Sequence, residues 1–342
     1  MFKPTDYEEI LKFKNPLFID LRSEEEFEEG TISGAISMPV LSNEERKIVG
    51  TLYVSGDVKG AKEKGVEFFA PKLGSYYRRM SQMEEEHEVV LFCSRGGYRS
   101  TALFNLLKTL GHSVYKLNHG YKGYRRYVLK FLETLGDYDY VVLKGYTGCG
   151  KTEILRELKS RGENVLDLEG LARHRGSLFG GVGMGSQPSQ KTFESALTES
   201  FKSFKPGPVF VEGESSRIGS INLPNPLIKA MAKSEGVFLI EDSVERRVER
   251  IKSDYLKDYG PEKKEEIISA FENLKRYISA ERYENYLKLI DEENFDFIIE
   301  DLIIKYYDAN YSIKKDKIFY KVCNEDINKS CDIILNKLKS TC

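Results

Sequence analysis

The sequence predicts an α/β protein built from two domains with parallel sheets. Amphipathic stretches alternate with short apolar runs, and this order is typical of a parallel sheet covered by helices. The length, 342 residues, exceeds what one hydrophobic core comfortably holds. The clearest apolar runs of the buried-strand type lie at residues 17–20, 88–92, 140–143, 209–212 and 237–241.

In the N-terminal series, the run at residues 88–92 leads into a loop that opens with Cys93. A helix is expected over residues 100–110, with Gly111 as its stop signal. Residues 113–117 then predict another strand.

The second series begins at residues 140–143, and a helix is expected over residues 153–161, ended by Gly162. Residues 165–168 predict a further strand. Beyond Ser243 the pattern turns helical and strongly charged, without a motif that indicates chemistry.

The boundary between the two series falls at residues 133–139. We therefore expect an N-terminal domain of residues 1–132 and a second domain of residues 138–342 with a helical C-terminal extension. The sequence does not indicate an oligomeric state.

Bulk properties exclude several classes of protein. The composition, 40% hydrophobic and 31% charged, is that of a folded globular chain. No apolar run approaches the roughly 20 residues needed to cross a bilayer, and the N-terminus lacks the apolar core of a signal peptide. We expect a cytoplasmic protein without membrane contacts. A net charge of −2 predicts no general attraction to nucleic acid.

Metal-ligating residues are sparse. The five cysteines contain no C-x-x-C pair and the four histidines never cluster, so neither a disulfide framework nor a compact zinc site is expected. We predict no directly ligated metal and no tightly bound cofactor.

Cys93 is the first candidate for chemistry. A strand that delivers a cysteine into a glycine-containing loop, with a helix following, directs backbone N–H groups at the sulfur. Arg95 and Arg99 add positive charge, and both effects favour the nucleophilic thiolate. The alternative is a buried structural cysteine, the commoner fate of a free cysteine.

The N-terminal part resembles the rhodanese-type sulfurtransferase domains over about residues 5–132. The six residues that follow Cys93 match the length of that family's active-site loop, whereas Thr31 stands where the family usually has a histidine, a structural position. The resemblance implies that Cys93 can carry a sulfur or selenium atom as a persulfide or perselenide, with the loop N–H groups stabilising the anion. Whether Cys93 acts as carrier, nucleophile or acid/base helper stays open, and Arg95 and Arg99 complete the expected catalytic set. The first signature of the family is carried by Asp20, Leu21, Arg22, Ser23, Glu26, Phe27, Gly30, Ile32, Gly34, Ala35 and Pro39.

Residues 145–152 fit the phosphate-binding pattern G-x-x-x-x-G-K-[ST] at every fixed position. An apolar strand precedes the motif and a helix follows it, which is the context that it requires. Backbone N–H groups would hold phosphate oxygens, with Lys151 at the terminal phosphate and the Thr152 hydroxyl facing Mg²⁺. Cys149 is interpreted as a small filler. The expected diphosphate-binding residues are Gly145, Gly148, Gly150, Lys151 and Thr152.

Two acids follow the apolar run at residues 209–212. Proteins with this phosphate-binding loop often hold Mg²⁺ indirectly through an acid at such a strand end, and Glu212 and Glu214 are both candidates. Nothing in the sequence separates them, and either could instead be a solvated carboxylate.

A glycine-rich segment lies between these strands. Five glycines between Gly176 and Gly185 exclude a regular helix or strand. We interpret the segment as a mobile substrate loop with a cationic entrance, and an ordinary surface loop is the alternative. Its candidate functional residues are Glu169, Arg173, His174 and Arg175.

The two domains together resemble the tRNA 2-selenouridine synthase family. Residues 167–180 read D-L-E-G-L-A-x-H-R-G-S-x-F-G, residues 187–190 read Q-P-S-Q, and residues 212–219 are also similar, so that the match extends to about Tyr255. The resemblance implies that the wobble 2-thiouridine in the anticodon loop of tRNA is S-alkylated by geranyl diphosphate. Selenium from selenophosphate then replaces the geranylated sulfur. Mg²⁺ could accompany the diphosphate.

RNA would contact a stretch that interleaves cations with tyrosines, which can hold phosphates and stack on bases. The candidate residues are Lys122, Tyr124, Arg125 and Arg126, and residues 75–79 form a second such stretch. A solvated helix face with core tyrosines is about equally compatible with either stretch.

Two other functions remain compatible with the sequence. One is a nucleotide hydrolase or kinase with this phosphate-binding loop, coupled to a sulfur- or selenium-carrying domain. The other is a relay protein, without catalysis, that binds a nucleotide only as a switch.

Overall fold

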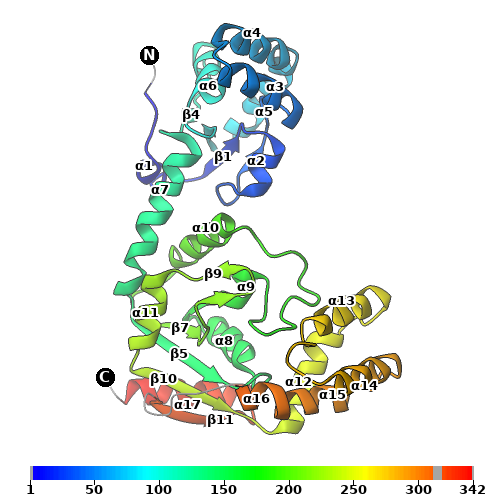
Figure 1. Ribbon diagram of the computed structural model, residues 1–342. Helices are drawn as coiled ribbons and strands as arrows, with labels where there is room; N and C mark the ends of the chain where they lie inside the picture. The colour runs from blue at the N-terminus through cyan, green and yellow to red at the C-terminus, as the bar shows by residue number, and fades with distance from the viewer. Residues whose placement is uncertain (1–2, 311–317, 341–342) are drawn as a thin grey trace. The chain divides into compact units, whose positions relative to one another are not determined.

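The computed structural model describes residues 3–310 and 318–340. The chain divides into two compact units, one formed by Met1–Phe131 with Glu194–Glu199 and the other by Leu132–Phe193 with Ser200–Cys342 (Figure 1). Both contain a parallel sheet with helices, which confirms the predicted α/β class.

The first unit has a four-stranded sheet in the order β2-β1-β3-β4, with every neighbouring pair parallel. Its strands are β1 (Pro16–Asp20), β2 (Ile36–Ser37), β3 (Glu88–Phe92) and β4 (Tyr115–Lys116). Its helices are α1 (Tyr7–Ile10), α2 (Glu24–Glu29), α3 (Asn43–Val54), α4 (Val58–Phe69), η1 (Ala70–Lys72), α5 (Leu73–Glu84), α6 (Tyr98–Thr109) and α7 (Gly120–Glu133), the last of which ends at the boundary.

Two capping boxes begin the helices that follow β1 and β2. Ser42 accepts a hydrogen bond from the Glu45 N–H, and the Glu45 carboxylate accepts one from the Ser42 N–H, so α3 begins at a fixed point. Ser23 and Glu26 form the corresponding box at α2. The box places Glu26 on the first turn of α2, where it reaches the cysteine loop described below.

A buried ion pair joins the end of β1 to the following turn. Arg22 donates to both carboxylate oxygens of Asp20 and to the Gly30 carbonyl oxygen, and its guanidinium lies over the ring of Tyr121. Thr31 donates its hydroxyl to Asp20 at 2.8 Å. These contacts give Thr31 a structural role.

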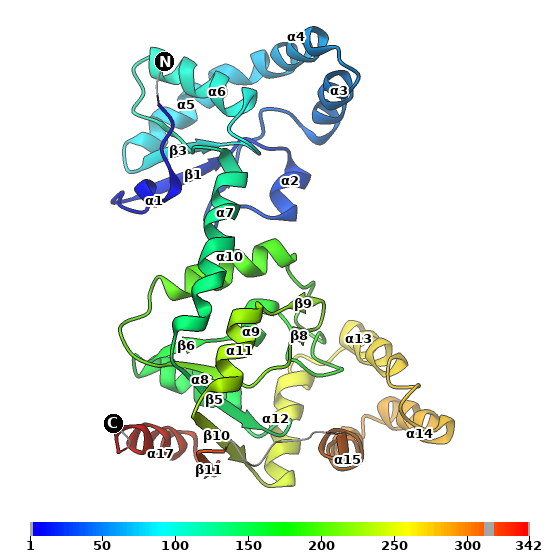
Figure 2. The ribbon, with the colours of Figure 1, turned by 60° about the vertical axis from the view of Figure 1, so that its left-hand side comes forward.

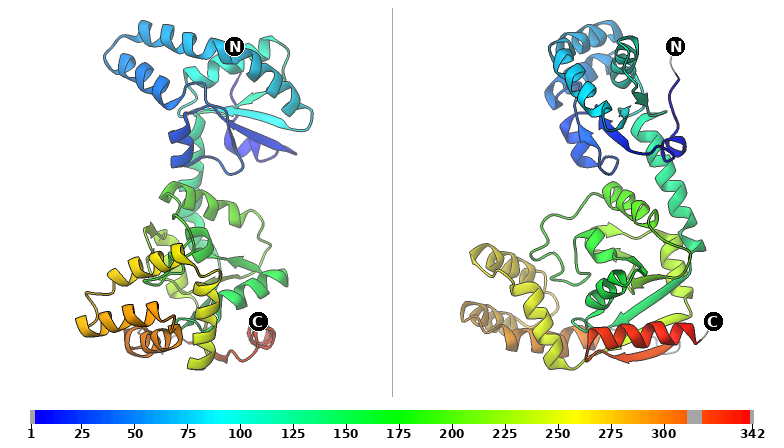
Figure 3. Two further views of the ribbon diagram at one scale, coloured as in Figure 1. Left: turned by 90° about the vertical axis from the view of Figure 1, so that its right-hand side faces the viewer. Right: turned by 180° about the vertical axis from the view of Figure 1, so that it is seen from behind.

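The second unit has a five-stranded parallel sheet in the order β11-β10-β5-β7-β6. Its strands are β5 (Tyr140–Gly145), β6 (Asn164–Leu166), β7 (Val209–Glu212), β10 (Gly236–Glu241) and β11 (Tyr320–Cys323), and β8 (Arg217–Ile218) pairs separately with β9 (Ile221–Asn222). Side chains of α8 (Lys151–Ser160) and α17 (Ile327–Lys339) share one hydrophobic core with the sheet. In Figure 3, α17 runs alongside β11.

The remaining helices precede β5 or lie between successive strands of this unit, and Glu194–Glu199 of one of them belong to the first unit. They are η2 (Thr134–Asp137), α9 (Leu168–Ala172), α10 (Gln190–Phe201), α11 (Asn225–Lys233), α12 (Val244–Leu256), α13 (Pro261–Glu272), α14 (Ala280–Asp291), α15 (Phe295–Leu302), the π-helical turn η3 (Ile303–Tyr307) and α16 (Asp308–Asn310). Helices α12 to α15 gather on one side of the unit (Figure 2).

The helical group has its own hydrophobic core. Side chains of α13, α14 and α15 form it, and Phe179 and Val182 of the glycine-rich segment are part of it. The segment has no regular structure, as its glycines predict, but its apolar side chains anchor it to the helices.

Three sequence expectations need correction. The region beyond Ser243 is not all helical, because β11 adds an edge strand beside β10. Only Val322 of β11 is buried, so this strand lacks the apolar run that identifies a buried strand. The strand β6 ends at Leu166, since α9 already begins at Leu168, and β4 is shorter than expected. None of the described helices is long and apolar enough to span a membrane.

The Asp20–Arg22 pair gives a prediction of stability. Asp20→Ala should lower the free energy of unfolding of the first unit by about 3–5 kcal/mol, because it leaves a buried guanidinium without its carboxylate. Denaturant unfolding of the full chain measures the change. Asp57→Ala, at the exposed N-terminus of α4, is the control and should cost about 1 kcal/mol. Equal losses for both variants would contradict a special role for the buried pair.

Candidate functional site

Cys93 follows β3 directly, and α6 begins five residues later. Two backbone hydrogen bonds tie the start of the loop to α7, from the Tyr121 N–H to the Cys93 carbonyl and from the Lys122 N–H to that of Ser94. Only glycine fits at position 120, because its φ is +56° and a Cβ there would lie 2.0 Å from the Cys93 carbonyl oxygen.

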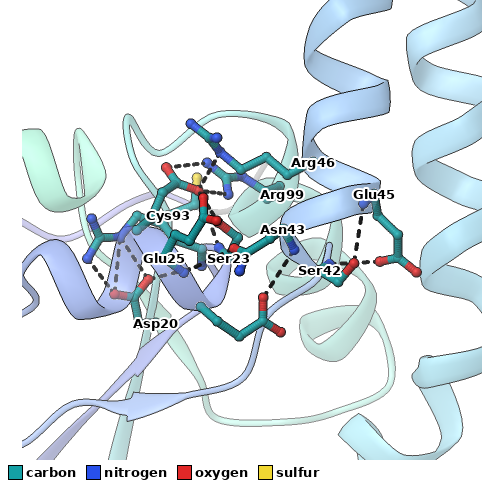
Figure 4. A network of polar contacts seen from close by, with 12 residues as sticks. Asp20, Ser23, Glu25, Ser42, Asn43, Glu45, Arg46, Cys93 and Arg99 are labelled. Carbon is teal, nitrogen blue, oxygen red and sulfur yellow. Dashed lines mark hydrogen bonds and ion pairs between the residues drawn. The ribbon is translucent and has the colours of Figure 1, made fainter.

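A polar network surrounds the Cys93 side chain (Figure 4). The sulfur lies 3.2 Å from the Ser100 hydroxyl. Arg99 donates to both Glu26 oxygens, at 2.6 and 3.3 Å, and Arg46 contacts the same carboxylate at 2.9 Å. Glu26 therefore holds Arg99 in place beside the cysteine.

These charges determine the ionisation of the network. Burial opposes the charge on Glu26, but the hydrogen bond from Arg99 and the charges of Arg99 and Arg46 outweigh it and lower the pKa of Glu26. Burial likewise disfavours the Arg99 cation, yet Glu26, with smaller contributions from Cys93 and Asp20, raises the pKa of Arg99. A guanidinium therefore stays charged beside the sulfur.

The cysteine loop has several backbone N–H groups that the described residues do not use. Among the described residues, no acceptor takes a hydrogen bond from the backbone N–H groups of residues 94–97. Cys93 itself is 3% exposed, while Arg95 is exposed to solvent and Arg99 is half-buried. The structure thus brings Cys93 and Arg99 together and leaves Arg95 at the rim of the loop.

The phosphate-binding loop of the second unit joins β5 to α8. Five consecutive carbonyl oxygens of this loop are hydrogen bonded. Lys151 donates to the carbonyls of Gly145 and Tyr146, at 2.9 and 3.3 Å. The other three donors are Arg247 to the Thr147 carbonyl at 2.8 Å, Arg250 to that of Gly148 at 3.0 Å, and Asn324 to that of Cys149 at 2.9 Å.

Because these carbonyls are satisfied, the loop can keep a conformation in which amides serve a ligand. Gly150 begins α8 with φ of +88°, and a Cβ there would lie 2.3 Å from the Asn324 amide nitrogen. No acceptor among the described residues takes the N–H of Thr147 or Gly148. The positive end of α8 adds to the attraction for phosphate.

A cavity of about 270 Å³ opens over this loop. Every expected diphosphate-binding residue lines it: Gly145, Gly148, Gly150, Lys151 and Thr152. Arg175 and Arg250 add positive charge to its wall, and Glu169 and Glu214 add carboxylates. The strand–loop–helix context thus produces the geometry that the motif predicts.

The structure separates the two acids that the sequence could not. Glu214 lines the cavity, whereas Glu212 lies beneath it, with one oxygen accepting the Glu169 N–H at 3.1 Å. The other oxygen of Glu212 is buried and has no partner among the described residues. Burial, followed by the charges of Glu169 and Asp167, raises the pKa of Glu212 well above its usual range. Its neutral form is therefore favoured, and Glu212 does not line the cavity.

The carboxyl groups of Glu169 and Glu214 lie close together, since a Cβ built at Gly176 would come within 3.1 Å of oxygens of both. Burial, followed by the charge of Glu214, raises the pKa of Glu169 to about 7. Burial also raises the pKa of Glu214, against the opposing influence of Lys151. Burial and the closeness of the two groups thus disfavour ionisation of both carboxyls at once.

The expected cationic entrance of the glycine-rich segment is only partly present. Arg175 lines the cavity, but its guanidinium donates to the carbonyls of Val182 and Asp254 and lies over the ring of Tyr255. Arg173 is exposed and His174 packs against Gly180, so neither lines the cavity. Burial and the charge of Arg175 lower the pKa of His174, which favours its neutral form.

An apolar cavity of about 70 Å³ adjoins the phosphate cavity. Thr147, Ser177, Ile251, Tyr255 and Tyr307 line both. The rest of its wall comes from Phe179 and from apolar side chains of the helical group and η3. The helical region, where the sequence indicated no chemistry, therefore builds part of this site.

The expected RNA-binding stretch lies on α7 and needs correction. Tyr124 is fully buried, so its ring cannot stack on a base, and Arg125 pairs with Glu194. Lys122 and Arg126 are exposed. The apolar spacing along α7 turns Tyr124 toward the core, as expected for a solvated helix face with core tyrosines. In the second stretch, Tyr76 is also buried.

Comparison with known proteins covers both units. The family model of the tRNA 2-selenouridine synthase AAA domain matches residues 138–341, and that of the rhodanese-like domain matches residues 3–127. The chain belongs to the tRNA 2-selenouridine synthase family. A member of this family from Pseudomonas fluorescens (strain Pf0-1) is 33% identical over 92% of each chain. Another, from Hydrogenovibrio crunogenus, is 32% identical over 96% of each chain.

A solved structure is similar to part of the chain. It is the N-terminal domain of a putative ATP/GTP binding protein from Clostridium difficile 630, and it is 38% identical over 37% of this chain and 99% of that one, with a TM-score of 0.37.

Sequence reasoning missed four residues of this family member's sites. Glu26 was noted only as part of a signature, and Arg247, Arg250 and Asn324 lie far along the chain from the loop that they hold. For Glu26, the capping-box spacing was an available signal. No local pattern connects a polar residue after β11 with residues 145–152.

Asn324 provides a test of the loop's support. Asn324→Ala should weaken the binding of inorganic diphosphate about tenfold, because it frees the Cys149 carbonyl and leaves the Ser330 hydroxyl without its acceptor. Isothermal titration measures the affinity. Asn336→Ala, on the exposed face of α17, is the matched control and should bind like the wild type. Equal affinities for all three proteins would show that the loop needs no support from this side.

Proposed function

We propose that this protein is a transferase that converts the wobble 2-thiouridine of tRNA to 2-selenouridine through an S-geranyl intermediate. Its substrates would be geranyl diphosphate, selenophosphate and tRNA. The observation that carries the proposal is the pair of adjoining cavities in the second unit. One is lined by the phosphate-binding loop and the other by apolar side chains, as a ligand with a diphosphate head and a hydrocarbon tail requires.

The apolar cavity also weighs against a nucleotide. A purine base needs hydrogen-bond partners when it is buried. The junction with the phosphate cavity offers the Ser177 and Tyr255 hydroxyls, which lie 3.1 Å apart and bond to one another. Beyond them, the wall is aliphatic and aromatic. A prenyl chain fits such a surface without leaving polar atoms unsatisfied.

In the first reaction, the uridine sulfur attacks the allylic carbon of geranyl diphosphate. A sulfur–carbon bond forms, the carbon–oxygen bond breaks, and diphosphate leaves. Lys151 and the loop amides would stabilise the charge that develops on diphosphate. No cluster of three or more metal-ligating side chains occurs within residues 3–310 and 318–340. Mg²⁺ would therefore be held mainly by the Thr152 hydroxyl and the diphosphate, and would supply further charge neutralisation.

Alkylation of the sulfur also removes the proton from N3 of the uridine ring, since C2 becomes doubly bonded to N3. The reaction therefore needs a base beside the sulfur. Glu169 lines the phosphate cavity beside Glu214, so a carboxylate is available there to accept a proton where diphosphate leaves. We assign the N3 proton to Glu169.

In the second reaction, selenium attacks C2 of the S-geranyl uridine. A carbon–selenium bond forms, the carbon–sulfur bond breaks, and geranyl thiol leaves with the selenium proton. Water then cleaves the selenium–phosphorus bond, phosphate leaves, and N3 of the ring regains a proton. We assign Cys93 to this step, with the amides of residues 94–97 and Arg99 stabilising a selenium or sulfur anion. Arg99, which is half-buried and held by its hydrogen bond to Glu26, would supply the positive charge for this anion.

Two variants separate the two reactions. Cys93→Ala should accumulate S-geranyl-2-thiouridine without 2-selenouridine, because only the selenium step needs the thiol. Lys151→Ala should lose both products. Nucleoside mass spectrometry of tRNA incubated with geranyl diphosphate and selenophosphate measures both, with Cys323→Ala, an exposed cysteine, as the control. Turnover of ATP or GTP without either product would support the nucleotide hydrolase instead.

The geranylation rate should increase as pH rises through about 7, because Glu169 accepts a proton only when it is ionised. The charged and titratable groups that act on it are Glu214, Glu212, Asp167, Lys151 and Tyr255. Glu169→Gln should slow the reaction about 100-fold and abolish this rise. Single-turnover rates between pH 5.5 and 8.5 provide the measurement, with affinity for geranyl diphosphate as the control. An unchanged profile in the variant would rule Glu169 out as the base.

A further inference from the structure

The helical group α12–α15 has a role that goes beyond packing. It supplies most of the wall of the apolar cavity, through Ile267 and Phe271 of α13 and Phe295 and Ile298 of α15. All four side chains are buried. The helical group thus encloses the apolar cavity, which adjoins the phosphate cavity. None of these four side chains lines the phosphate cavity itself.

The lining residues of the apolar cavity can be divided into those that also line the phosphate cavity and those that do not. Ile251, Tyr255 and Tyr307 line both cavities and therefore form the junction. Phe179, Ile267 and Phe271 line only the apolar cavity and therefore lie beyond it. The rings of Phe179 and Phe271 meet edge to face at 4.7 Å, and Tyr286 packs against Phe271 from behind. Phe179 and Phe271 thus form an aromatic part of the wall that belongs to the apolar cavity alone.

The size of the cavity limits what it can hold. An engineered cavity of about 150 Å³ holds a benzene ring, which has six carbons. The apolar cavity has about 70 Å³, so by this measure it has room for about three carbons, which is part of one five-carbon isoprene unit. The reacting carbon must stay near the diphosphate, so the first isoprene unit occupies the junction. The far end of a second unit fills the apolar cavity, and a third would meet the aromatic rings.

We propose that Ile267 and Phe271 are chain-length determinants that select a ten-carbon allylic diphosphate over shorter and longer homologues. This inference rests on the proposed function, since it concerns the hydrocarbon tail of the same substrate. A dimethylallyl chain leaves the cavity unfilled and loses the hydrophobic gain of burying it. A farnesyl chain requires α13 or the glycine-rich segment to move away, at the cost of exposing their shared core.

Neighbouring residues of α13 offer a matched test. Ile267 lines the cavity, whereas Ile268 packs against the same core without lining it. Ile267→Ala should raise the ratio of kcat/KM for farnesyl over geranyl diphosphate at least tenfold, because it adds room for part of a third unit. Ile268→Ala removes the same atoms elsewhere and should leave the ratio unchanged. Phe271→Leu, which retains a large apolar side chain, should shift the ratio in the same direction as Ile267→Ala.

The assay measures prenylation of 2-thiouridine tRNA with each diphosphate, after thermal unfolding has shown that each variant is folded. If the wild type prenylates the tRNA but neither Ile267→Ala nor Phe271→Leu changes the chain-length ratio, the chain-length role is overturned and the proposed function stands. If the wild type uses no allylic diphosphate, the proposed function and the inference both fail. An equal shift in Ile268→Ala would also overturn the inference, because general loosening of the core would then explain it.

Discussion

The chemistry of the second unit depends on hydrogen bonds to the carbonyl oxygens of the phosphate-binding loop. A tight loop can offer amides to a ligand only if its carbonyls are satisfied elsewhere. Arg247 and Arg250 of α12 and Asn324 after β11 each hold one of these carbonyls. The loop's conformation is therefore fixed by residues about 100 to 175 positions away in sequence.

The same hydrogen bonds also position the apolar cavity. Helix α12 contributes the two arginines to the loop, and Ile251 and Tyr255, further along the same helix, line both cavities. One rigid element thus sets the distance between the phosphate site and the apolar site. This coupling explains why a charged, amphipathic helix without catalytic motifs lies against the loop. It also gives α13 to α15 a surface on which to pack beside the apolar cavity.

The sequence predicted the parts of the structure that local patterns specify. The runs at residues 88–92 and 209–212 are strands with the expected bounds, and the phosphate-binding motif lines a cavity as its spacing requires. The sequence did not predict features that depend on contacts between residues far apart in the chain. Whether Tyr124 faces solvent or core depends on what α7 packs against. The role of Glu214 depends on Glu169, which lies on another element, and no spacing rule connects the two.

The two anion-binding loops hold their cations differently, and this difference agrees with the ligands proposed for them. At the cysteine, Glu26 holds Arg99 in place, so one guanidinium stays beside the Cys93 sulfur. At the phosphate loop, Lys151 rests on the carbonyls of Gly145 and Tyr146. Lys151 also lies near the carboxyl groups of Glu169 and Glu214, whose pKa values are raised by burial. These groups hold Lys151 less firmly than the ionised Glu26 holds Arg99, so an arriving diphosphate can compete with them. In the proposed function, a sulfur or selenium anion at Cys93 would keep the charge of Arg99 beside it. The departing diphosphate would instead need a cation that can move with it, which Lys151 would supply.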